Sequence, residues 1–121
     1  MRKQKRRDEV ILHHYQSNSG KDLILDYIKS LPDDEQTDGF SVLECLENGK
    51  IDKINFKRWE KKIYEVYFYK NNRIFYVVAD GENMYLLHAC RKQKNKTEKR
   101  DKNIVIKRAK ELGSILGKSF I

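Results

Sequence analysis

Apolar and polar positions change their spacing three times along the chain. A short apolar run at 8–15 comes first, and two segments with helical spacing follow at 19–31 and 32–47. Between 63 and 90 the apolar residues alternate with polar ones, and helical spacing returns over 97–112. The predicted order is therefore strand, helix, helix, three strands, helix. This order is typical of an α+β fold of the β-α-α-β-β-β-α type.

The two early helices have recognisable ends. Ser19 and Asp22 resemble a capping box, and Pro32 ends the first helix and opens the second, where three acidic residues suit the helix dipole. We expect the second helix to end near Glu47, with Gly49 beyond it. Its inward residues are predicted to be Phe40, Leu43 and Leu46.

The alternating segment predicts an antiparallel meander. Its apolar runs lie at 63–69, 73–78 and 84–90, and the turn-forming sequences Asn71-Asn72 and 80–83 separate them. Residues 50–55 are interpreted as a connector. The two early helices are expected to cover one face of an antiparallel sheet, which leaves the other face available.

The last helix completes a single domain. Thr97 is its predicted N-cap and Gly113 its stop, with an apolar stripe between them. A chain of 121 residues has room for one core. We expect a flexible basic arm at 1–7, one domain at 8–113 and a tail at 114–121.

The charge of the chain is unevenly distributed. Residues 1–56 carry 9 basic and 11 acidic side chains, whereas residues 57–121 carry 17 and 7, and the window 91–110 alone carries 10 and 2. Such a positive field attracts polyanions. The alternative is an ordinary solvated helix face.

Several classes of protein and site are disfavoured. The chain has no apolar run long enough for a membrane span, and no apolar core follows its basic start, so a cytoplasmic location is expected. Cys45 and Cys90 lack the spacing of a metal site or a disulfide framework, and are interpreted as small buried residues.

A succession of short motifs between about residues 9 and 112 resembles a known family. The motifs are Ser19-Gly20-Lys21, Ser30-Leu31-Pro32, Phe56-Lys57-Arg58-Trp59, Ile63-Tyr64-Glu65-Val66, Arg73-Ile74-Phe75-Tyr76, Leu86-Leu87-His88, and Lys92 followed by Lys94-Asn95-Lys96-Thr97. In this order and spacing they are similar to the phage-derived, HigB-like branch of the RelE/ParE toxin superfamily. The predicted topology is also that of the family.

The resemblance implies a toxin of a type II toxin-antitoxin system. Such a toxin is a ribosome-dependent mRNA endoribonuclease without metal or cofactor, and a cognate antitoxin, here expected to be a helix-turn-helix protein, neutralises it. The ribose 2′-hydroxyl attacks the adjacent phosphate. The reaction needs a base, cations for the charge on phosphorus, and an acid for the leaving oxygen.

Three cations are the candidate catalytic residues. Arg73 on a central strand could clamp a phosphate with two hydrogen bonds, or it could pair with Glu65 on the adjacent strand as a purely structural residue. Lys92 and Lys96 could bind phosphate or transfer a proton. Each could equally be a solvated lysine.

Five further residues are expected to contact RNA, namely Lys57, Arg58, Tyr67, Arg91 and Lys94. Trp59 is interpreted as a core anchor and His88 as a structural histidine, although base stacking and general base catalysis are their functional alternatives. Tyr67 stands where many relatives have an arginine. Loss of that cation could cost about 2–4 kcal/mol of transition-state stabilisation and leave weak or no activity.

Two other functions fit the same fold. One is a non-catalytic, ParE-like inhibitor of DNA gyrase, and the other is a basic nucleic-acid-binding protein of phage or plasmid origin. For the toxin, the expected partners are the antitoxin, mRNA and the ribosome, with no membrane. The isolated chain is expected to be a monomer or a homodimer.

Overall fold

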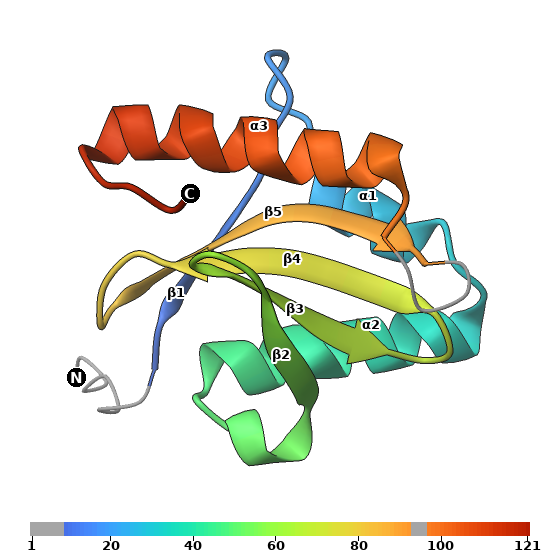
Figure 1. Ribbon diagram of the computed structural model, residues 1–121. Helices are drawn as coiled ribbons and strands as arrows, with labels where there is room; N and C mark the ends of the chain where they lie inside the picture. The colour runs from blue at the N-terminus through green and yellow to red at the C-terminus, as the bar shows by residue number, and fades with distance from the viewer. Residues whose placement is uncertain (1–8, 93–96) are drawn as a thin grey trace.

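In the part of the chain that the structure describes, five strands, three helices and one short 3₁₀ helix make up the fold (Figure 1). The computed structural model describes residues 9–92 and 97–121. In chain order the elements are β1 (Ile11–His14), α1 (Leu23–Lys29), α2 (Asp33–Glu47), η1 (Ile51–Lys53), β2 (Asn55–Glu60), β3 (Ile63–Phe68), β4 (Asn72–Val78), β5 (Asn83–Arg91) and α3 (Lys99–Leu116). The predicted α+β class is confirmed. Among the described residues, no helix is long and apolar enough to span a membrane.

The sheet differs from the prediction in two respects. Its strand order is β1-β5-β4-β3-β2, and β1 pairs with β5 in parallel, so the sheet is mixed rather than antiparallel. The connection from β1 to β5 contains both early helices and strands β2, β3 and β4, and is long enough to bring β5 alongside β1 in parallel. Strand β2 was also missed, because its charged residues conceal the apolar alternation. Such charges are usual on an edge strand.

Helices cover both faces of the sheet (Figure 1). On the α1/α2 face, Ile24, Ile28 and Leu46 pack against apolar residues of β3, β4 and β5. On the opposite face, which we call the α3 face, Val105 and Ala109 pack over the sheet. The prediction that the second face stays available was therefore wrong: the apolar stripe of α3 must be buried, and the sheet supplies the surface.

The two early helices largely follow the sequence signals. The predicted capping box that begins at Ser19 is not formed: Asp22 is itself the N-cap of α1, and its carboxylate accepts hydrogen bonds from the backbone N–H groups of Ile24 and Leu25. In α2, Leu43 and Leu46 are buried as predicted, but Phe40 is 40% exposed. The close contact falls instead at Gly39, where an added Cβ would lie 3.0 Å from the Phe68 ring. The inward stripe of α2 thus passes through a glycine rather than the adjacent phenylalanine.

Helix α3 begins and ends later than predicted. Its N-cap is Glu98, while the Thr97 hydroxyl accepts a hydrogen bond from the Trp59 indole N–H at 3.1 Å. The helix continues through Gly113 and ends at Gly117, which has the left-handed φ of 66°. The chain then folds back, and Phe120 is buried against the core of the α3 face. The segment 114–121 is thus part of the packed domain rather than a tail.

Gly113 provides the first test. A Cβ at this position would lie 2.5 Å from the Lys118 backbone oxygen, which belongs to the returning segment. Gly113→Ala should therefore lower the free energy of unfolding by about 1–3 kcal/mol, although alanine is intrinsically the better helix former. Urea unfolding followed by circular dichroism measures the change. The control, Ser114→Ala at the adjacent exposed position, should change stability by less than about 0.5 kcal/mol. A stabilised Gly113→Ala variant would contradict the close approach.

Candidate functional site

A buried carboxylate lies at the centre of the candidate site. Glu65 on β3 is fully buried, and the Lys92 ammonium lies 2.9 Å from each of its two carboxylate oxygens. The contact to Oε1 has hydrogen-bond geometry and the contact to Oε2 does not. Lys57 adds a second ammonium 3.5 Å from Oε1. Because a buried charge without a partner is strongly unfavourable, Glu65 requires these cations.

Strand alternation and register bring the site together from three strands and from the residue that follows a fourth. Glu65 shares the α3 face with Ile63, which packs in the core beneath α3. Lys57 on β2 lies directly opposite Glu65, and Arg73 on β4 lies opposite Tyr67. Lys92 follows β5, where its backbone N–H donates to the Asn71 carbonyl at 2.7 Å. We call Lys57, Glu65, Tyr67, Arg73 and Lys92 the Glu65 cluster.

Arg73 is held under the surface of the cluster. Its side chain is 7% exposed, and its guanidinium carbon lies 4.2 Å from the centre of the Tyr67 ring. The Nη1 group donates to the backbone oxygens of Lys70 and Asn72, at 3.3 and 2.9 Å. Its buried Nε has no hydrogen-bond partner among the described residues. The alternative prediction, an ion pair between Arg73 and Glu65, is wrong, because Lys57 and Lys92 pair with that carboxylate instead.

Lys57 is the solvent-facing cation of the cluster. Its side chain is 55% exposed, whereas that of Lys92 is 5% exposed. The Tyr67 phenol beside it, followed by the Glu65 carboxylate, raises the pKa of Lys57 above its usual value. Three cations and one carboxylate give the cluster two positive charges in excess. An anion would thus meet Lys57 first, with Arg73 and Lys92 adding charge from below.

The other predicted site residues lie apart from the cluster or outside the described residues. Lys94 and Lys96 belong to 93–96, which the structure does not describe. Arg58 lies opposite Tyr64 and shares its α1/α2 face, away from Lys57. Arg91 also lies on the α1/α2 face, where its Nη2 is 2.7 Å from the Glu35 carboxylate of α2. The structure thus brings together Arg73, Lys92, Lys57 and Tyr67.

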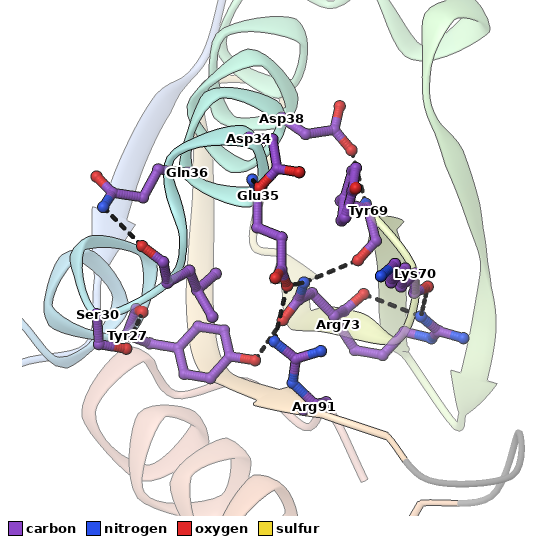
Figure 2. A network of polar contacts seen from close by, with 12 residues as sticks. Tyr27, Ser30, Asp34, Glu35, Gln36, Asp38, Tyr69, Lys70, Arg73 and Arg91 are labelled. Atoms are coloured by element: carbon purple, nitrogen blue, oxygen red, sulfur yellow. Dashed lines mark hydrogen bonds and ion pairs between the residues drawn. The ribbon is translucent and has the colours of Figure 1, made fainter.

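A second polar network, missed by the sequence analysis, fixes the turn that precedes Arg73 (Figure 2). The fully buried Asn72 side chain donates to Glu35 at 2.7 Å and to the Tyr69 carbonyl at 2.8 Å. The Tyr27 hydroxyl donates to Asn72 at 2.5 Å, and burial raises the pKa of Tyr27 to about 12. Asn72 was predicted as a turn residue, but it lies in β4, and the positive φ falls on Lys70. Local sequence patterns carry no signal for this long-range network.

His88 and Trp59 have structural partners. The His88 ring stacks on Phe75, and its Nε2 lies 2.8 Å from the Asp101 carboxylate of α3. Burial lowers the pKa of His88, which favours the neutral ring. The Trp59 ring meets the Phe75 ring edge-on at 5.0 Å and packs in the same core. Both side chains thus join the sheet to the segment carrying α3.

The ligand atoms of His88, Cys90 and Asp101 lie within 4.8 Å of one another, a spacing that could suit a metal ion. The Arg108 guanidinium, however, lies 3.4 Å from His88 Nδ1. An imidazole that bound a metal through Nε2 would carry its proton on Nδ1 and direct it at a group that can only donate. Burial also raises the pKa of the Cys90 thiol to about 12. The surroundings therefore favour a hydrogen-bonded His88–Asp101 pair.

Comparison with models of known protein families identifies one family that matches the chain. The sequence model of the family described as phage-derived protein Gp49-like (DUF891) matches residues 26–110, well over half of the chain. The chain belongs to this family. The Gp49-like family is toxin-like and is grouped with RelE and HigB. The matched region includes every residue of the Glu65 cluster. A search of curated proteins found no match.

The buried ion pair of this Gp49-like protein gives the second test. Glu65→Gln removes the counter-charge of Lys92 and should lower the free energy of unfolding by about 3–5 kcal/mol. The double variant Glu65→Leu with Lys92→Met replaces the whole pair by apolar groups and should recover most of this loss. Urea unfolding of the three proteins measures both effects.

The control is the exposed ion pair between Lys102 and Glu60, whose side chains are 49% and 38% exposed. Lys102→Met should change stability by less than about 1 kcal/mol, because solvent already screens this pair. If Glu65→Gln unfolded at the same urea concentration as the wild type, the Glu65–Lys92 pair would not be buried in solution.

Proposed function

We propose that this protein is the toxin of a toxin-antitoxin pair in the RelE/HigB group, and that it cleaves mRNA on the ribosome. The observation that carries the proposal is the Glu65 cluster, in which Lys57, Arg73 and Lys92 converge on one face of the sheet. Membership of the toxin-like Gp49-like family supports it. The surplus positive charge of the cluster suits the phosphate backbone of RNA.

The proposed reaction is attack of a ribose 2′-hydroxyl on the neighbouring phosphorus. The new O–P bond closes a cyclic phosphate, and the bond to the 5′-oxygen of the next nucleotide breaks. The 2′-hydroxyl proton passes to a base, and the leaving 5′-oxygen takes a proton from an acid. We assign charge stabilisation on phosphorus to Lys57 and Arg73, and phosphate binding or proton transfer to Lys92 and Lys96.

The contacts of Tyr67 suggest how it acts where many relatives carry an arginine. Its ring lies under the Arg73 guanidinium at 4.2 Å, and the Lys57 ammonium lies 5.7 Å from the ring centre. The aromatic face attracts both cations and holds them near each other. Tyr67 would then position two cations instead of supplying a third. We therefore propose that the site is retained, with a smaller total charge.

The third test is induction of the chain in a bacterial host without an antitoxin. Growth should stop, and sequencing of RNA 5′ ends shortly after induction should show new cuts within translated messages. Arg73→Ala should abolish both effects. Arg73→Lys keeps the charge but loses the planar fork, and should retain partial activity. Circular dichroism of both purified variants must show a folded protein, because Arg73 is buried.

Two results would oppose this proposal. Growth arrest with intact mRNA and DNA damage signalling would indicate inhibition of DNA gyrase by a ParE-like protein. RNA binding without new 5′ ends or growth arrest would indicate a nucleic-acid-binding protein without catalysis.

The fourth test asks which face of the sheet binds RNA, by changing two adjacent residues that lie on opposite faces. Lys57 lies in the Glu65 cluster and Arg58 lies on the α1/α2 face. Lys57→Ala should weaken binding of single-stranded RNA. It should also reduce the slope of log Kd against log salt concentration by about the amount that one phosphate contact contributes. Arg58→Ala should change both quantities much less. Fluorescence anisotropy over a salt series measures them, and equal effects of the two variants would contradict the assignment of RNA to the α3 face.

A further inference from the structure

An apolar groove lies on the α1/α2 face of the sheet. Its volume is about 450 Å³. Three large apolar side chains, Ile51, Phe56 and Val78, line it and are 40%, 41% and 47% exposed. Exposed apolar groups that gather in one hollow, rather than scatter over a surface, are typical of a binding site.

The groove crosses four strands and continues the layer formed by α1 and α2. Tyr64 of β3, Tyr76 of β4 and Met84 of β5 line it and also pack in the core beneath these helices. The outer wall comes from β2 and η1. The helices thus cover one part of this face, and the groove is an adjoining part that they leave open.

The floor of the groove is rigid and its charged groups are basic. The Tyr64 and Tyr76 rings stack with centres 5.7 Å apart, and the Phe56 ring tilts against Tyr64 at 6.4 Å. Stacked aromatic side chains bind a partner with little loss of conformational freedom. The charged residues that line the groove are Arg58 and Lys62. The hollow is thus complementary to an apolar surface flanked by carboxylates.

We propose that the groove binds an amphipathic, acidic helix of a protein partner. The apolar side of the helix would cover Ile51, Phe56 and Val78, and its carboxylates would face Arg58 and Lys62. A helix is the expected occupant because helices already cover the rest of this face, and an amphipathic helix laid in a groove is a common mode of recognition. If the proposed function holds, this partner is the antitoxin, and that identification rests on the proposed function.

The two faces of the sheet would then have different partners. Adjacent residues of a strand point to opposite faces, so Tyr64 lines the groove while Glu65 lies in the Glu65 cluster. The helix would bind without touching Lys57 or Arg73. A partner bound in the groove would therefore leave the Glu65 cluster uncovered.

The test uses the full chain and the protein encoded by the adjacent gene. Ile51→Glu, Val78→Glu and Lys62→Glu each place a negative charge in the groove and leave the Glu65 cluster intact. Each variant should remain toxic, escape neutralisation by the co-expressed partner, and bind the purified partner at least about tenfold more weakly in isothermal titration calorimetry. Ile115→Glu is the control, because Ile115 is 79% exposed on α3 and lies away from the groove. It should behave like the wild type.

The outcomes separate the two proposals. Wild-type affinity in the three groove variants, or failure of the adjacent-gene protein to bind the wild-type chain, would overturn the groove assignment. If the groove variants lost partner binding but the wild-type chain expressed alone were not toxic, the groove assignment would stand and the proposed toxin function would be wrong. If sedimentation showed a wild-type homodimer that Val78→Glu dissociates, with partner affinity unchanged, the groove would be a self-association surface and the inference would be wrong.

Discussion

A fully buried carboxylate is the constraint on which the candidate site depends. Glu65 has no exposure to solvent, and the apolar core beneath α3 begins on the same strand at Ile63. An isolated charge in such a place would be strongly destabilising, so the fold must bring cations to it. Lys92 supplies one from the end of β5, and Lys57 a second from the edge strand β2. The pairing thus joins segments that are distant in the sequence and fixes where the positive charges of the α3 face lie.

The same constraint explains why the cluster is positive although it contains an acid. One carboxylate engages two lysines, and Arg73 is held separately, by the Tyr67 ring and by the backbone oxygens of Lys70 and Asn72. The turn before β4 is fixed by the buried Asn72 side chain, which donates to Glu35 of α2 and to the Tyr69 carbonyl. A guanidinium held in this way needs little reorganisation when an anion arrives, and such preorganisation strengthens electrostatic stabilisation. The acidic residues of α2 thus support the basic site from the opposite face of the sheet.

Local patterns predicted every α-helix and every strand except β2, but not the contacts between distant segments. Pro32, the alternation from Ile63 to Cys90 and the stripe of α3 were sufficient for this, because each depends on neighbouring residues. Strand β2 was concealed by its own charges, and Gly113 was taken for a helix stop although its lack of a Cβ admits the returning backbone. The resemblance to toxins selected Arg73 and Lys92 as candidate catalytic residues. The role of Glu65 could not be predicted in this way, because it depends on the register of β3 with its neighbouring strand. Arg91 follows Cys90 in the same basic segment as Lys92, yet lies on the other face, where Glu35 binds it.

The two proposals assign partner binding and catalysis to opposite faces of the sheet. On the α3 face the accessible surface of the Glu65 cluster is basic, which suits a phosphate chain, and on the α1/α2 face the groove is aromatic and apolar, which suits a folded protein segment. One five-stranded sheet supports both, because side chains alternate along each strand. Residues of the groove can therefore change with a partner while Glu65, Arg73 and Lys92 keep their contacts. On both proposals, the groove could adapt to a new partner without a change in the residues assigned to RNA.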